Sequence, residues 1–196
     1  QLFIFLDFSK NKKTSRMKSQ KGKIDIICGS MFSGKTEELI RRLKRLDFAK
    51  KKYKLFKPIV DNRYDNNKVV SHNMNSVQAI SIAKSEEIFN HIRNEKIIAI
   101  DEAQFLDKKL YEVCEKLIKN GIDIIIAGLD MDYKGEPFGS MPKLLAISDN
   151  VKKMHAVCFE CGETANYTFR INNDTQQVLI GSKENYKALC KNCFFK

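Results

Sequence analysis

The sequence predicts an α/β fold, a doubly wound and mostly parallel sheet followed by a small, mostly β module. Two observations predict the sheet: short apolar stretches alternate with segments of helical periodicity, and polar residues gather where the apolar stretches end. A third observation predicts the module. After about residue 150 the chain carries paired cysteines and short alternating stretches such as 165–171, which are typical of a small extended unit.

The first strand is expected at residues 24–28 and the helix after it at 35–50. The helix is predicted because apolar residues recur at helical spacing, with charged residues on the remaining face. These apolar residues are Leu39, Ile40, Leu43 and Leu46. Residues 53–60 are expected to form the next strand, in which Pro58 indicates an edge position or a strand end because proline has no N–H to donate.

Further along the chain, a short helix is expected over 85–93, capped by its first residue, a serine. Residues 97–100 and 124–127 are apolar at consecutive positions, which predicts strands covered on both faces, as in a parallel sheet. Between these two strands we expect a helix that begins at its N-cap Asp107 and ends at Gly121.

Composition limits the classes of protein that the chain can represent. With 196 residues, 43% of them hydrophobic, the chain can bury a sizeable core. No apolar run reaches the roughly 20 residues that span a bilayer, so no membrane-spanning helix is expected. The net charge of +11 has two interpretations, a nucleic-acid partner or a general bias toward lysine, and the bias is favoured because Lys, Ile and Asn are abundant throughout.

A glycine-rich motif joins the first strand to the first helix and matches the phosphate loop GxxxxGK[ST] in spacing and setting. It reads Gly29-Ser30-Met31-Phe32-Ser33-Gly34-Lys35-Thr36. Its backbone N–H groups and the positive end of the helix suit phosphate, Lys35 suits the outer phosphates, and the Thr36 hydroxyl suits a magnesium ion. The motif predicts a nucleoside triphosphate with Mg²⁺ in a fold of the P-loop NTPase type. The alternative is a plain glycine turn with the lysine in solvent.

Two carboxylates follow the apolar strand 97–100. Asp101 can hold a magnesium-bound water opposite the phosphate loop. Glu102 points elsewhere and is a candidate base for phosphoryl transfer to a hydroxyl. The alternative is an acidic N-cap pair for the following helix.

Two cysteine pairs, Cys158-x-x-Cys161 and Cys190-x-x-Cys193, can present four thiolates tetrahedrally to a structural Zn²⁺. Disulfides are the competing interpretation, and the absence of a secretory signal favours the metal. His155 could substitute as a ligand, although a surface position is the preferred interpretation. The two remaining cysteines, Cys28 and Cys114, are expected in the core.

Three segments are expected from these patterns. Residues 1–20 are interpreted as a disordered or spurious extension, with Met17 as a possible natural start. Residues 21–150 are expected to form the nucleotide-binding α/β domain. Residues 151–196 are expected to form the zinc-binding module. The long loop between its two cysteine pairs is expected to be functional and to cover the substrate.

Taken together, the motifs resemble those of the type II thymidine kinases from about residue 21 to the end of the chain. The resemblance depends on the phosphate loop, on 61–64 (Asp-Asn-Arg-Tyr), 101–105 (Asp-Glu-Ala-Gln-Phe), 128–130 (Gly-Leu-Asp) and 135–139 (Gly-Glu-Pro-Phe-Gly), and on the cysteine pairs with Tyr186 between them. It implies a cytoplasmic homotetramer that transfers the γ-phosphoryl group of ATP to the 5′-hydroxyl of thymidine, for nucleotide salvage and DNA synthesis. It also implies a structural zinc and a lasso-like loop over the nucleoside.

The resemblance assigns roles residue by residue. Lys35, Thr36 and the rest of the phosphate loop would bind the triphosphate with its magnesium, Asp61 and Arg63 would lie near the phosphates, and Glu102 would be the base. The nucleoside pocket would be formed by Met31, Phe105, Leu129, Tyr133, Phe138, Ile180, Gly181, Ser182 and Tyr186. Tyr133 departs from the phenylalanine of many relatives.

Two other functions compete with this one. A nucleic-acid-dependent ATPase with a zinc ribbon would share the phosphate loop, the cysteines and the positive charge, but the chain lacks a further large lobe. A nucleotide-binding regulator without catalysis is disfavoured by Glu102 beside Asp101. The residues do not separate thymidine from deoxyuridine, since one methyl group is worth only about 1–3 kcal/mol in a pocket.

Overall fold

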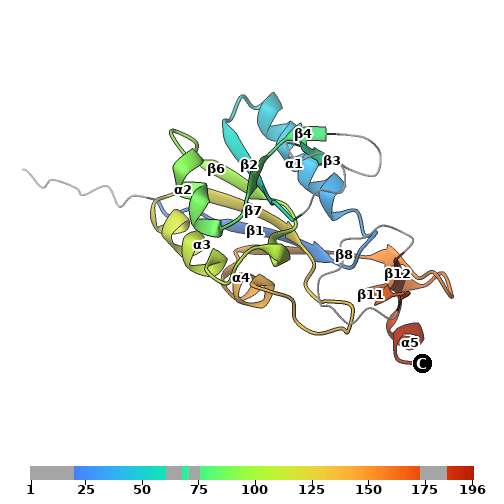
Figure 1. Cartoon of the computed structure of the whole chain (residues 1–196). Coiled ribbons are helices and arrows are strands. Elements are labelled where there is room, and N and C mark those ends of the chain that lie inside the picture. Colours follow the sequence, from blue (N-terminus) through green and yellow to red (C-terminus); the bar gives the residue numbers. More distant parts are fainter. Residues whose placement is uncertain (1–19, 61–67, 71–75, 173–184) are drawn as a thin grey trace, which may run out of the picture.

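A six-stranded sheet forms the centre of the computed structural model, which describes residues 20–60, 68–70, 76–172 and 185–196 (Figure 1). The strand order is β5-β2-β6-β7-β1-β8, and every strand is parallel to its neighbours. The strands are β1 (Ile24–Gly29), β2 (Tyr53–Pro58), β5 (Ile80–Ile82), β6 (Ile97–Ile100), β7 (Asp123–Gly128) and β8 (Asn150–Met154). The predicted α/β class is therefore confirmed.

Helices cover both faces of this sheet (Figure 1). The helix α1 (Lys35–Phe48) packs on one face, and the other face carries η1 (Ser85–Glu87), α2 (Ile88–His91), η2 (Ala103–Phe105), α3 (Leu110–Lys119) and α4 (Met141–Ile147). Successive strand residues point to opposite faces, so Ile26 belongs to the core beneath α3 while Ile27 belongs to the core beneath α1. Both side chains are fully buried, as expected for a sheet covered on both faces.

The second strand is shorter than expected. It ends at Pro58, and the exposed residues Ile59 and Val60 belong to the turn that follows. Pro58 lies at a strand end, as one of the two expectations had it, but β2 is an interior strand between β5 and β6. The ladder toward β5 continues past the proline, because the N–H of Ile59 donates to the carbonyl of Ile82.

The expected helix over 85–93 is replaced by a 3₁₀ turn and a single turn of α-helix. Ser85 does not cap it: the hydroxyl and the N–H of Ser85 both donate to the carboxylate of Asp107. Asp107 also accepts the N–H of Lys109, and α3 begins at Leu110 rather than directly after Asp107. Gly121 ends this helix with φ 75°, in the left-handed conformation that was expected.

Small β-structures form the C-terminal part, which we call the cysteine module (β9 to α5). Its elements are β9 (Ala156–Val157), β10 (Thr164–Ala165), β11 (Tyr167–Arg170), β12 (Tyr186–Leu189) and α5 (Lys191–Phe194), with β9 pairing β10 and β11 pairing β12. In Figure 1 the module, orange to red, lies beyond the carboxyl end of β1. A further hairpin, β3 (Lys68–Val70) with β4 (Ser76–Gln78), lies outside the main sheet.

Strand β8 continues the main sheet to Met154, past the expected division between residues 150 and 151. The division into domains itself stays a prediction, and residues 1–19 of the expected extension lie outside the described residues. Within the described part of the chain, the helices are all too short or too polar to cross a bilayer.

Candidate active site

The phosphate loop links β1 to α1 in the conformation that anion binding requires. Phe32 and Gly34 both have positive φ, 65° and 81°, so the loop can turn its N–H groups toward one side. At Gly29, with φ 138°, a Cβ atom would lie 2.1 Å from the carbonyl oxygen of Met154 on β8. Only glycine fits there, and the loop therefore begins in direct contact with β8.

Two side chains of the loop donate hydrogen bonds to the loop's own backbone. The Lys35 ammonium donates to the Ser30 carbonyl at 2.8 Å, and the Ser33 hydroxyl donates to the same oxygen at 2.8 Å. Lys35 is largely buried, although its charge normally favours solvent. Its amine therefore lies within the loop region, where it can meet phosphate oxygens.

The loop and the end of β6 meet as the sequence suggested. The hydroxyl of Thr36 lies 3.4 Å from a carboxylate oxygen of Asp101, which is buried at the carboxyl edge of the sheet. Hydroxyl and carboxylate oxygens are the ligands that Mg²⁺ takes in nucleotide sites, so this pair fits the ion that the triphosphate would bring.

Glu102 has a backbone conformation that is uncommon for a residue other than glycine, φ 49° and ψ 41°. Its N–H donates to Asp101 at 3.0 Å, and its carboxylate accepts a 2.5 Å hydrogen bond from the Gln104 amide. The side-chain amide oxygen (Oε1) of Gln104 accepts the Leu129 N–H at 2.9 Å, which ties the segment after β6 to the segment after β7. Gln104 was quoted in the sequence motif without a role, and its neighbours in the sequence do not mark it as a buried residue.

Two aromatic side chains expected in the nucleoside pocket contact each other. Phe105 and Phe138 make an edge-to-face contact with ring centroids 5.6 Å apart, and Phe138 and Leu129 are both buried. Met31, in the phosphate loop, is half-buried and its N–H donates to the Thr168 hydroxyl of β11 at 3.0 Å. The cysteine module therefore contacts the phosphate loop directly.

Tyr133 and Tyr186, the other two described residues of the expected pocket, are joined by a residue that the sequence analysis missed. The guanidinium carbon of Arg170 lies 3.7 Å from the ring centroid of Tyr133. The same guanidinium donates to the Tyr186 hydroxyl at 2.8 Å. Arg170 lies in the alternating stretch 165–171, in which an arginine is normally expected to face solvent. Its exposed fraction is nevertheless only 5%.

A second unpredicted pair lies near the phosphate loop. Asp130, just after β7, is buried and forms a 2.7 Å ion pair with Lys153 of β8. The hydrogen bond from the lysine to Asp130 raises the pKa of Lys153.

Five of the expected site residues lie outside the described residues, so the structure does not place them: Asp61, Arg63, Ile180, Gly181 and Ser182.

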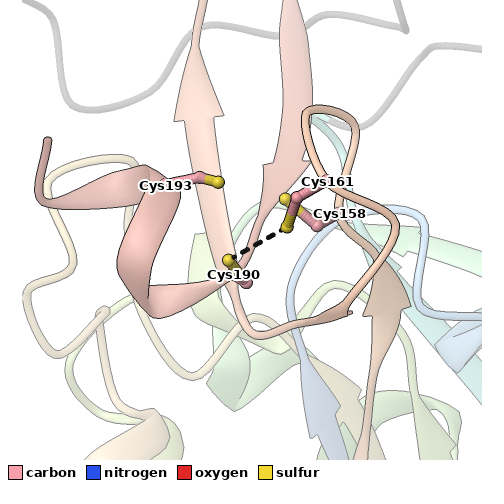
Figure 2. Close-up of side chains that lie close together, drawn as sticks. All are labelled: Cys158, Cys161, Cys190 and Cys193. Carbon is pink, nitrogen blue, oxygen red and sulfur yellow. Dashed lines mark hydrogen bonds between the residues drawn. The ribbon is translucent and has the colours of Figure 1, made fainter.

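The four cysteines of the module converge, as Figure 2 shows. Their sulfur atoms all lie within 4.8 Å of one another, and those of Cys161 and Cys190 are 3.6 Å apart. Zn–S bonds of about 2.3 Å in a tetrahedron place sulfur atoms about 3.8 Å apart, so the set fits zinc. Burial opposes the thiolate of Cys158, but hydrogen bonds from backbone N–H groups outweigh burial and lower its pKa to about 6.

The remaining cysteines and His155 have other surroundings. All six cysteines are free thiols, so the disulfide alternative is not what the structure shows. Cys28 and Cys114 are buried as expected, and burial raises their pKa values to about 11 and about 12. His155 is exposed and hydrogen-bonds to Asn166 rather than joining the sulfur cluster.

Comparison with known proteins agrees with this geometry. Residues 22–194 match the family model described as Thymidine kinase. A curated protein named Thymidine kinase from Bacteroides fragilis (strain YCH46) is 49% identical over 175 residues, covering 89% of this chain and 88% of the relative. One from Bacteroides thetaiotaomicron is 49% identical over 177 residues, covering 90% and 89%, and one from Porphyromonas gingivalis (strain ATCC 33277) is 48% identical over 177 residues, covering 90% and 87%. With a match of this extent and identity, the chain belongs to the thymidine kinase family.

Proposed function

We propose that this protein transfers the γ-phosphoryl group of ATP to the 5′-hydroxyl of thymidine, and of deoxyuridine, giving the nucleoside monophosphate and ADP. The name of its relatives, Thymidine kinase, supports the substrate. The observation that carries the proposal is local: a phosphate loop, the Thr36 and Asp101 pair and a restrained Glu102 carboxylate meet at one edge of the sheet. Phosphoryl transfer needs a cradle for the phosphates, a metal site and a base beside the acceptor alcohol.

The phosphate loop, residues 29–36, holds the triphosphate in this proposal. Its N–H groups and the start of α1 bind the phosphate oxygens, and the Lys35 ammonium leaves the Ser30 carbonyl for the outer phosphates. Thr36 and Asp101 hold the magnesium ion, which supplies charge neutralisation of the phosphates when bound. Asp61 and Arg63 act near the phosphates, an assignment that depends on the family resemblance.

Glu102 accepts the proton of the 5′-hydroxyl as that oxygen attacks phosphorus. The amide of Gln104 orients its carboxylate, and the uncommon left-handed backbone of Glu102 is of the kind found at functional sites. A base one residue from a metal ligand reaches the alcohol without competing for the ion.

The base binds in a largely apolar pocket in this proposal. By family resemblance, its walls include Met31, Phe105, Leu129, Tyr133, Phe138 and Tyr186, of which Phe105 and Phe138 make an edge-to-face contact. Aromatic faces suit a pyrimidine, and burial beside the transfer site excludes water that would otherwise consume ATP. Ile180, Gly181 and Ser182 complete the pocket through their backbone, by family resemblance.

The remaining expectations are proposals of the same kind. The four cysteines hold a structural Zn²⁺ that fixes the module. The enzyme works in the cytoplasm, where reducing conditions keep its free thiols available to the metal. Residues 21–150 and 151–196 act as nucleotide-binding domain and zinc module, and the enzyme assembles as a homotetramer that acts on ATP and thymidine, without a membrane or nucleic acid.

The direct test replaces Glu102 by glutamine and measures thymidine-dependent ADP formation. Removing a general base costs about 10²–10⁴-fold in rate, while the binding of ATP should stay unchanged. Glu112→Gln, an exposed carboxylate on α3, is the matched control and should keep the full rate. Wild-type turnover in Glu102→Gln would remove this residue as the base. ATP turnover stimulated by DNA or RNA, but by no nucleoside, would replace the kinase by a nucleic-acid-dependent ATPase.

A further inference from the structure

Arg170 occupies an unusual place for a cation. It is the last residue of β11, directly opposite Tyr186, the first residue of β12, in the antiparallel ladder. Its exposed fraction is only 5%. A buried guanidinium is costly to desolvate, so its surroundings must offer specific compensation.

That compensation comes from two aromatic residues on different parts of the chain. The guanidinium lies over the ring of Tyr133 with its central carbon 3.7 Å from the ring centroid, a cation–π contact. One of its nitrogens donates to the Tyr186 hydroxyl at 2.8 Å, and its central carbon lies 5.3 Å from the centre of that ring. Both contacts use the planar fork of arginine, which the single ammonium of lysine does not reproduce.

The two tyrosines belong to the two halves of the molecule. Tyr133 lies in the segment between β7 and α4, which leaves the carboxyl edge of the main sheet, and Tyr186 begins β12 of the cysteine module. Arg170 therefore contacts both aromatic side chains and bridges them across the junction. It also closes the base of the hairpin, where the N–H of Ile171 donates to the carbonyl of Asn185.

We propose that Arg170 is a positioning residue for the nucleoside: by bridging Tyr133 and Tyr186 it sets the width of the pyrimidine pocket. This inference rests on the proposed function, since it assigns both tyrosines to the thymidine pocket. Arg170 itself acts through the two rings and takes no part in phosphoryl transfer. Loss of Arg170 should therefore weaken nucleoside binding and leave the triphosphate site as it is.

The experiment is a steady-state comparison of Arg170→Met, Arg170→Lys and wild type, with KM for thymidine and for ATP measured separately. We expect the KM for thymidine to rise about tenfold or more in Arg170→Met, because a desolvated cation–π contact and a charged hydrogen bond are lost together. Arg170→Lys should recover little of it. The KM for ATP should change by less than about twofold. A merely structural role would lower the active fraction, and so kcat, without moving the KM for thymidine.

Two further variants guard against misfolding. Tyr186→Phe removes only the accepting oxygen and should raise the KM for thymidine by a few fold; combined with Arg170→Met, it should add almost nothing. Lys187→Met is the matched control: this lysine follows Tyr186 on the same strand but pairs with Glu160 and lies over Phe159 instead, so its KM for thymidine should stay at the wild-type value. Zinc content should be equal in all of these proteins.

Unchanged KM for thymidine in both Arg170→Met and Tyr186→Phe would overturn the inference while thymidine phosphorylation by wild type persists. An equal rise in Lys187→Met would overturn it too, because the effect would then belong to the module as a whole. Failure of the proposed function looks different: wild type itself would neither bind thymidine in a calorimetric titration nor phosphorylate it.

Discussion

The main sheet and the cysteine module are stabilised by different means. The strands of the sheet contribute fully buried aliphatic side chains to two cores, one on each face. The module buries a cluster of small residues, Ala156, Cys158, Ala165, Ala188, Leu189 and Cys190. It leaves Val157 72% exposed and Phe159 73% exposed. A core of this size is too small to order a chain by itself, so we expect the module to depend on the proposed zinc ion and on contact with the sheet.

The largest expected effect comes from removing zinc. Chelation should open the module, because the binding free energy of a four-cysteine site is of the order of 10 kcal/mol and none of it is available without the ion. The main sheet should remain folded and keep ATP binding, whereas thymidine binding is lost. Hydrogen exchange measured by peptide would show fast exchange confined to β9 to α5. A single cooperative loss of both regions would show that they are not energetically separate.

The same substitution in the two cores gives the next comparison. Leu117→Ala, at a fully buried position of α3, should lower the free energy of unfolding of the sheet by about 3–5 kcal/mol. Leu189→Ala, in the small cluster of the module, should lower zinc affinity but shift the urea midpoint of the sheet very little. An equal shift of that midpoint in Leu189→Ala and in Leu117→Ala would contradict the separate stabilisation of the sheet and the module.

Much of this contrast was visible in the sequence. Strands β6 and β7 were predicted because short runs that are apolar at consecutive positions are typical of strands covered on both faces. The approach of Thr36 to Asp101 was also expected from the sequence. Strands that alternate with helices form a parallel sheet, so the segments that follow β1 and β6 lie at the same edge of it.

Other features could not be read in this way. Strand β8 is an edge strand with exposed polar residues, so its sequence carries no buried stripe and was grouped with the module. The helix α4 spans only two turns, too few for a helical period to stand out. Gln104 and Arg170 are polar residues whose partners lie far away in the sequence, and nothing local marks them as buried. Periodic patterns of apolar residues therefore predict buried strands and helices well, whereas the sequence does not predict isolated polar residues that are buried by distant partners.

A smaller effect is expected at the junction of α1 with β8. Glu38 is buried and pairs with Arg41 at 2.7 Å, Arg42 at 3.0 Å and Lys152 of β8 at 3.2 Å. The hydrogen bond from Arg41 is the main reason that its pKa falls from 4.5 to about 2. Because the folded state lowers this pKa, the stabilisation is present above about pH 4.5 and is lost as the pH falls toward 2.

Glu38→Gln should accordingly cost about 2 kcal/mol at pH 7, with solvent screening taken into account, and almost nothing near pH 2. Urea unfolding at several pH values would measure the difference. Glu115→Gln removes an exposed pair with Lys119 and should lie within about 0.5 kcal/mol of wild type at every pH. A pH-independent loss in Glu38→Gln would assign its effect to packing instead.

The smallest effect is expected on the outer face of the module. Val157→Thr should change stability and zinc affinity by less than about 0.5 kcal/mol, because the side chain is 72% exposed. Thermal unfolding of the zinc-loaded protein would measure it. A clear loss would mean that another copy of the chain covers this face, so that the module has a larger core in the assembly than in the single chain.

Strand β8 also has a consequence for recombining members of this family. It pairs with β1 beneath the phosphate loop and reaches β9 through a single residue, His155. Just before it, the carboxylate of Asp149 accepts the N–H of Ile24, at the start of β1. A chimaera that imports a foreign cysteine module should therefore be spliced upstream of Ser148, so that the donor brings its own edge strand. A splice at His155 would instead join the imported module to the edge strand of the recipient, whose residues are matched to the recipient's own phosphate loop.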